Sequence, residues 1–225
     1  MPSDETLTRG RLRTPRAAAI AGIVFSILLI AIIAMLRMTV PADPTESGVW
    51  LSTHAGTVVL ALHLIPFDGI AFLWFIGVLR DRLGQREDRF FATVFFGSGL
   101  LFLAMLFAAG AIVGALVVAF AAAPAQLVDS PTFHFARAAA YIIANVYAIK
   151  VAAVFMISTS TVAMSTRFAP RWIAILGYVL ALILLFGSSA MAWSITVLPA
   201  WVLLVSIHIL VDNFRRPDAA ASMPG

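Results

Sequence analysis

The sequence predicts an all-α fold, a polytopic transmembrane bundle of six helices with both termini in the cytoplasm. Hydrophobic residues make up 62% of the 225 residues and charged residues only 12%, against about half and a quarter in a soluble domain. The apolar residues fall into six runs, and a helix needs about 20 such residues to cross a bilayer. The arginines gather in alternate connections between the runs, as they do in multi-pass membrane proteins.

The first three expected spans are residues 17–38, 53–79 and 90–120, and a polar cytoplasmic tail, residues 1–16, precedes them. The first run is longer than the roughly 7–15 residues of a signal-peptide core, and no small-residue cleavage site follows it, so we expect it to remain a span. The third run exceeds the length of a span. Either it is strongly tilted, or its alanine-rich end after Gly114 leaves the membrane.

The last three expected spans are residues 138–164, 172–188 and 192–212, followed by a polar cytoplasmic tail, residues 214–225. A short basic turn containing a proline separates the fourth run from the fifth, and a Gly-Ser-Ser connection separates the fifth from the sixth. Residues of these types are turn signals. The expected six-helix domain therefore covers residues 17–213.

The distribution of arginine predicts the orientation of the chain. Twelve arginines lie in the N-terminal tail, the second and fourth connections and the C-terminal tail, whereas only Arg37 and Arg137 lie on the opposite side. Short loops rich in arginine stay on the cytoplasmic side of a membrane. We therefore expect a multi-pass protein of the inner (plasma) membrane with both termini in the cytoplasm.

Asp68 and Lys150 are the two charged residues deep inside apolar runs. A charged side chain at the bilayer centre costs about 2.5–3.5 kcal/mol, so such residues are functional hypotheses by default. At about 1.5 Å per residue both lie ~20 Å below the expected outer ends of their spans. We expect the two side chains to pair near the membrane midplane. A buried pair that only fixes the packing is the open alternative.

Three further polar residues and a hinge complete the candidate site. His63 and Tyr147 are the expected additional donors to the charge pair, and Asn145 lies on another face of the same span as Tyr147. Pro66 has no backbone N–H, and Gly69 loosens the same stretch, so we expect the second span to kink there. Ordinary tolerance of proline in a membrane helix is the alternative explanation.

Several function classes receive no support from the sequence. It contains no Gly-rich phosphate loop, no HExxH and no GxSxG. The missing motifs favour a protein that is not an enzyme, but the sequence leaves this question open. The lack of cysteine excludes disulfides and thiolate metal sites. His63 and His208 lie at different depths, which disfavours haem, and six spans disfavour a retinal site at Lys150. We expect no cofactor and no metal.

The segment Arg16-Ala-Ala-Ala-Ile-Ala-Gly22, the six apolar runs and the chain length resemble uncharacterised bacterial six-span integral membrane proteins, a domain of unknown function. This resemblance implies a six-helix bundle in a bacterial membrane and supplies no catalytic residues. The letters Arg-Ala-Ala-Ala recur at Arg137, which leaves open an inverted repeat of three spans.

The sequence leaves two functions open and names no substrate. The first is a small-solute or proton-coupled pathway, based on the two intramembrane charges and the kinked second span. The second is a non-catalytic membrane partner or scaffold subunit, based on the small soluble parts and on glycines in the third run that permit close packing. The expected partners are the lipid bilayer and either a homo-oligomer or another membrane protein. Nucleic acid is not expected, because the arginines lie at the ends of apolar runs.

Overall fold

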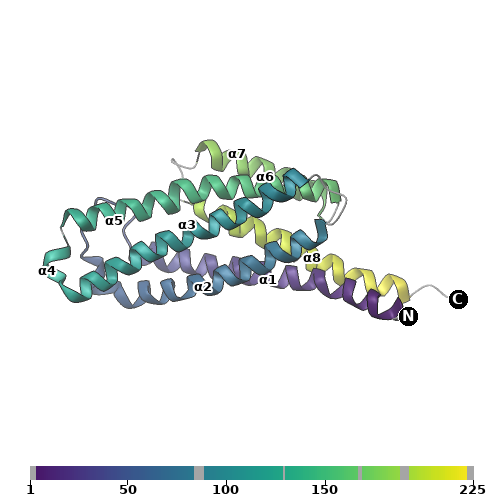
Figure 1. Ribbon diagram of the computed structural model, residues 1–225, viewed down its shortest axis with the longest axis horizontal. Helices are drawn as coiled ribbons and strands as arrows, with labels where there is room; N and C mark the ends of the chain where they lie inside the picture. The colour runs from purple at the N-terminus through teal and green to yellow at the C-terminus, as the bar shows by residue number, and fades with distance from the viewer. Residues whose placement is uncertain (1–3, 84–88, 129, 167–168, 188–192, 222–225) are drawn as a thin grey trace.

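The computed structural model describes residues 4–83, 89–128, 130–166, 169–187 and 193–221. These residues form helices and short turns, with no strand among them. Figure 1 shows the helices lying side by side in one elongated bundle. The all-α prediction is therefore confirmed for the described part of the chain.

Seven helices account for most of the bundle, and each long apolar run of the sequence falls on one continuous helical stretch. They are α1 (Asp4–Thr39), α2 (Trp50–Leu83), α3 (Arg89–Ala122), α5 (Pro131–Ile142), α6 (Ala148–Thr166), α7 (Arg171–Gly187) and α8 (Ser194–Ala221). A five-residue π-helix, η2 (Ile143–Tyr147), joins α5 to α6 without a break, and α4 (Pro124–Leu127) is a single turn. The expected fourth span is thus one helix with a π turn inside it.

Five helical stretches are long and apolar enough to cross a membrane. They are Ala17–Thr39, Trp50–Arg80, Ala92–Ala122, Pro131–Ser165 and Ser194–Asn213. The chain therefore has the helices of a multi-pass membrane protein. Helix α7 is apolar but has only 17 residues, so the sixth span remains a prediction.

The helices are longer than the expected spans. Helix α1 begins at Asp4, inside the segment expected as a polar tail, and α8 continues to Ala221. Helices α2 and α3 have 34 residues each, which is about 50 Å at 1.5 Å per residue. The hydrocarbon core of a bilayer is about 30 Å thick. The ends of these helices therefore cannot be taken as the edges of the membrane.

The helices pack as a ring, except for α7, which packs on the outside of α6. Helix α1 packs against α2 and α8, α3 packs against α2, α5 and α6, and α7 packs mainly on α6. The start of α1 and the end of α8 lie at one end of the bundle, which we call the terminal end, and residues 40–49 and 123–128 lie at the other, the distal end (Figure 1). Residues 40–49 connect α1 to α2 and are called the distal loop below.

Aromatic side chains fill the core in the terminal half of the bundle. The ring of Phe72 lies 4.5 Å from that of Phe25, 5.7 Å from that of Phe102 and 5.3 Å from that of Phe155, and Phe95 lies 5.1 Å from Phe155. These five rings come from α1, α2, α3 and α6, and they are called the phenylalanine plug below. All five rings are buried, and aromatic pairs at such distances contribute about 0.5–1.5 kcal/mol beyond burial, so the plug fills this half of the core.

Candidate functional site

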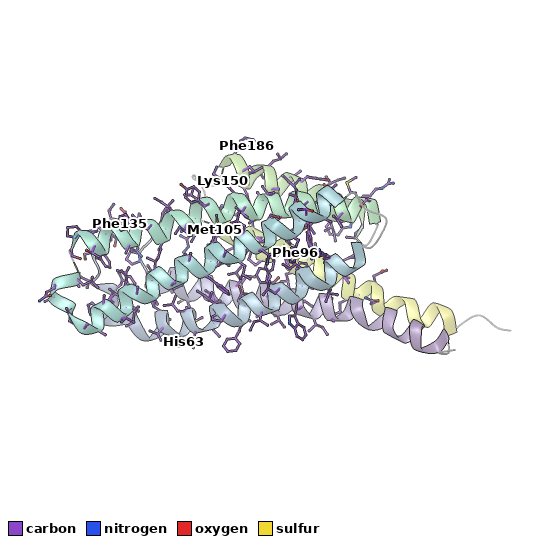
Figure 2. The ribbon with its side chains drawn as sticks, viewed as in Figure 1. His63, Phe96, Met105, Phe135, Lys150 and Phe186 are labelled. Atoms are coloured by element: carbon purple, nitrogen blue, oxygen red, sulfur yellow. The ribbon has the colours of Figure 1, made fainter. Side chains whose placement is uncertain are left out.

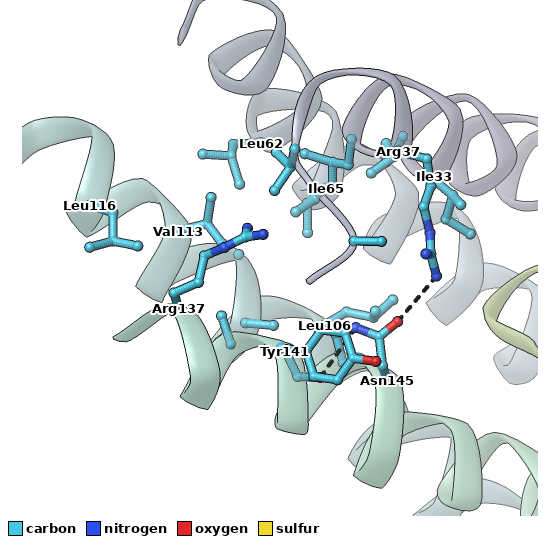
Figure 3. Close-up of a pocket in the computed structure, with 18 of the residues that line it drawn as sticks. Ile33, Arg37, Leu62, Ile65, Leu106, Val113, Leu116, Arg137, Tyr141 and Asn145 are labelled. Atoms are coloured by element: carbon cyan, nitrogen blue, oxygen red, sulfur yellow. Dashed lines mark hydrogen bonds between the residues drawn. The ribbon is translucent and has the colours of Figure 1, made fainter. Parts of the chain in front are cut away.

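A cavity of about 180 Å³ lies between α1, α2, α3 and α5, on the distal side of the phenylalanine plug. One water molecule needs about 10–15 Å³ of such space, so the cavity holds a small molecule or roughly a dozen waters. Most of its wall is aliphatic (Figure 3). The aliphatic residues include Leu29, Ile32, Ile33, Leu36, Leu62, Ile65, Leu106, Val113 and Leu116. A mostly apolar cavity with a few polar groups is the usual composition of a small-molecule site.

Asp68 is the acidic residue of this cavity. Its side chain is 1% exposed, and neither carboxyl oxygen has a hydrogen-bond partner among the described residues. A Cβ on the neighbouring Gly69 would lie 2.5 Å from Phe107 Cζ and 2.9 Å from Leu103 Cδ1, so α2 and α3 approach closely beside the acid. A buried carboxyl without a partner costs free energy. Asp68 is therefore a buried acid that faces the cavity without a partner among the described residues.

Arg137 lies at the distal end of the cavity and holds the distal loop. Its Nη2 donates to the backbone oxygen of Pro41 at 2.5 Å and to that of Asp43 at 3.3 Å. The side chain is 8% exposed, its guanidinium carbon lies 5.5 Å from the centre of the Trp50 ring, and its Nε has no partner in the described part of the chain. Trp50 Nε1 is equally without a partner there. Two buried N–H donors thus remain at this end of the cavity.

The mouth of the cavity lies between α1 and α5. Of the lining residues, Arg37, Ala42 and Tyr141 are the exposed ones. Arg37 Nη2 donates to Asn145 Oδ1 at 3.4 Å and so bridges α1 and η2, as the dashed line in Figure 3 shows. Asn145 Nδ2 donates to the backbone oxygen of Tyr141 at 3.2 Å. π-Helical turns are rare and are frequent at functional sites, and here the turn carries Asn145 into the cavity wall.

The expected pair of Asp68 and Lys150 is not formed, and this prediction is wrong. Lys150 Nζ donates to the backbone oxygen of Leu185 at 3.1 Å, on the exposed side of α6 (Figure 2). The last carbonyls of a helix have no intrahelical partners, and a cation is favoured near them. Lys150 therefore caps the C-terminal end of α7, whereas Asp68 faces the cavity between α1, α2 and α3. Counting residues along the two spans predicted similar depths for both side chains, but it could not predict which faces of their helices they occupy.

His63 and Tyr147, the expected additional donors, also lie outside the cavity. His63 is exposed, and its Nδ1 donates to the backbone oxygen of Val59 at 2.8 Å (Figure 2). Tyr147 is 53% exposed. Its face was assigned for a straight helix at 100° per residue, and the π turn changes that relation. Of the expected polar residues, the cavity brings together Asp68 and Asn145.

Pro66 lies inside α2, which continues through it from Trp50 to Leu83. The proline therefore does not end the helix, and a hinge at Pro66 and Gly69 remains a prediction. Sequence reasoning missed the cavity's arginines. Their signal was their position, since Arg37 and Arg137 are the two arginines that the predicted orientation puts on the side opposite the other twelve.

No protein-family model, curated protein or solved structure matches the chain. The fold and the site define a class, a helical multi-pass membrane protein with a cavity that has an ionisable side chain at each end. The resemblance to bacterial six-span proteins remains a prediction.

Proposed function

We propose that the protein carries a small solute through the bundle and that Asp68 is the polar group the solute meets at the inner end of the cavity. The observation that carries this proposal is a buried, unpartnered carboxyl facing a cavity large enough for a small molecule. Ionisable residues within membrane spans mark solute and proton pathways. A proton on Asp68 is one way in which such a pathway is driven.

The closed terminal side of the cavity supports a carrier. Phe72 lies one helical turn from Asp68 on α2, and its ring belongs to the phenylalanine plug. A site open on one side and closed on the other is the arrangement that alternating access requires. Pro66 on α2 and η2 on the opposite wall are two helix irregularities at this level, and such irregularities are where helices bend.

The proposal includes a location. In the inner membrane of a bacterial cell, with both termini in the cytoplasm, the cavity opens toward the outside. The support is the excess of arginine in the two tails and in the second and fourth connections of the sequence, twelve residues against Arg37 and Arg137.

The test uses the natural absence of cysteine. Ala109 is buried and lines the cavity, so Ala109→Cys reports access to it. We expect this variant to react with a charged, membrane-impermeant methanethiosulfonate in both right-side-out and inside-out vesicles, because a carrier exposes its site alternately to each side. Reaction should be faster from the distal side, where the cavity is open.

The matched control is Ala152→Cys, whose position is buried in the core and does not line the cavity. It should stay unreactive in both kinds of vesicle. If Ala109→Cys is labelled from the distal side alone, the protein is not a carrier. It would then be a protein that only binds its ligand, such as a membrane partner subunit. Labelling from neither side would remove the solute pathway altogether.

A further inference from the structure

We infer that the ligand of this cavity is an elongated molecule with an acidic group at one end, an apolar middle and an ammonium group at the other. The inference rests on the proposed function for the existence of a ligand, and it adds the chemical class of that ligand. Each third of the cavity selects one part of the ligand.

The distal third selects an acidic group. Arg37 and Arg137 reach this part of the cavity from α1 and α5, on opposite sides of the space in Figure 3. Arg137 Nε and Trp50 Nε1 are buried donors without a partner among the described residues. Guanidinium groups bind carboxylates and phosphates with short, charge-assisted hydrogen bonds. An acidic group placed here satisfies two donors that the described residues leave unpaired.

The middle third selects an apolar chain. The lining of α1 runs from Leu29 to Arg37, which is about 12 Å of helix at 1.5 Å per residue. The facing walls carry Leu62, Ile65 and Val113, which offer no side-chain hydrogen bond. A polar group buried against such walls would lose its bonds to water. The middle of the ligand is therefore a hydrocarbon chain.

The inner third selects a cation. Asp68 has no partner in the described part of the chain, and an ionised carboxyl is purely an acceptor. A ligand ammonium supplies both the donors and the opposite charge. The two ends of the cavity then fix the direction of the ligand, because the reversed molecule would set its acidic group against Asp68 and its ammonium against the arginines.

The length of the ligand follows from the helix register. Phe25 on α1 packs against Phe72 on α2, and the two helices run in opposite directions (Figure 1). Asp68, four residues before Phe72, is then level with Leu29, and Pro41, the loop residue that Arg137 binds, lies twelve residues farther along the chain. This is about 18 Å at the helical rise, and a hydrogen bond of about 3 Å at each end leaves about 12 Å, which suits an amino acid with a chain of about eight carbons.

The experiment compares 8-aminooctanoate with octanoate and octylamine, binding each to the full chain in lipid nanodiscs. The emission of Trp50, which lines the cavity, is the readout, and Trp50→Phe gives the background from the other tryptophans. Loss of one charged contact weakens binding about tenfold or more. We therefore expect 8-aminooctanoate to bind at least about tenfold more tightly than either single-headed chain.

Variants give a crossed pattern that a merely damaged fold would not produce. Asp68→Asn should weaken 8-aminooctanoate about tenfold and leave octanoate unchanged, and Arg137→Gln should weaken 8-aminooctanoate and leave octylamine unchanged. Arg37→Gln, at the exposed mouth, takes the place of Arg137→Gln if that variant does not fold. The matched control is Arg171→Gln, at the start of α7 and outside the cavity.

Each other outcome overturns a stated part. If octanoate binds as tightly as 8-aminooctanoate, the ammonium group is not part of the ligand class. If octylamine binds as tightly, the acidic group is not part of it. If none of the three changes Trp50 emission while Ala109→Cys reacts from both sides, the ligand class is wrong and the carrier stands. If 8-aminooctanoate binds but Ala109→Cys reacts from one side only, the ligand class stands and the carrier is wrong.

Discussion

Asp43 shapes the distal loop that Arg137 holds over the cavity. Its Oδ1 accepts hydrogen bonds from the backbone N of Thr45 at 2.8 Å and from Thr45 Oγ1 at 2.7 Å. The bonds from Thr45, and to a smaller degree the charge of Arg137, lower the pKa of Asp43 from its ordinary value of 3.8. The ionised form of Asp43 is thus the form that the folded loop favours.

A pH dependence follows from this lowered pKa. The contribution of Asp43 to stability is complete above its unfolded pKa of 3.8 and is lost as the pH falls through the lower folded value. We expect the melting temperature to drop between about pH 5 and about pH 3, and to drop less in Asp43→Asn. Thr45→Val, which removes the hydroxyl bond, should lie between the two. An equal drop in all three proteins would contradict this role.

Single residues were predictable where a polar group interrupts an apolar run. Asp68 and Asn145 were found in this way, because a polar side chain inside a span needs a reason. Arg37 and Arg137 were used only to predict the orientation of the chain, because the ends of the apolar runs were taken as the membrane edge. This assumption does not hold, because helices of about 50 Å are longer than the bilayer core is thick. The partner of Lys150 was not predictable, because it is a backbone carbonyl at the end of another helix.

At the scale of the element, the positions of the helices along the chain were predictable, whereas their full lengths and the π turn were not. The expected span of residues 53–79 lies inside α2, and that of residues 138–164 lies inside the continuous α5, η2 and α6. Hydropathy marks where a run begins and ends. The π turn left no such mark in the sequence Ile143–Tyr147, so the faces of the fourth span were assigned for a regular helix.

Close packing of α7 against α6 and α8 depends on Gly177. A Cβ at this position would lie 2.8 Å from Trp201 Cζ2, and the Trp201 ring is held by a 3.3 Å hydrogen bond from its Nε1 to the backbone oxygen of Ile173. We expect Gly177→Ala to lower the free energy of unfolding by about 1–3 kcal/mol, the usual cost of overpacking. Thermal or denaturant unfolding in detergent measures this change.

Gly97 on α3 is the matched control, because a Cβ there would meet nothing within 4 Å. Alanine is about 1 kcal/mol more favourable than glycine in a helix, so Gly97→Ala should leave stability unchanged or raise it. If Gly97→Ala were the more damaging of the two, the packing role of Gly177 would be wrong. The result also tests whether the glycines of the third run, which the sequence marked for close packing, act equally.

At the scale of the whole molecule, the helical class was predictable and the arrangement of helices was not. The excess of apolar residues requires a second apolar phase, and only helices satisfy the backbone within one segment there. The sequence does not show that α1 lies beside α8, or that α7 packs outside α6. Such contacts depend on small residues and shape rather than on hydropathy.

The orientation of the whole molecule is testable with reporters. Fusions after Gly48, Arg86, Val128 and Ala169 should read outside, inside, outside and inside, because twelve arginines lie on one side and two on the other. Alkaline phosphatase, active outside the cytoplasm, and green fluorescent protein, fluorescent inside it, give opposite readouts. A reversed reading at Arg86 would refute the orientation, and equal readings at Val128 and Ala169 would refute the fourth span.

Arg137 ties the surface of the molecule to its interior. One nitrogen of its guanidinium holds Pro41 and Asp43 in the distal loop, and another lines the cavity without a partner. A ligand that pulls the guanidinium into the cavity strains its hydrogen bonds to the loop, and a partner that immobilises the loop restrains the guanidinium. Thermodynamic linkage makes such effects reciprocal. An antibody fragment that recognises the distal loop would therefore change the affinity of the cavity by the same factor by which a bound ligand changes the affinity of the antibody.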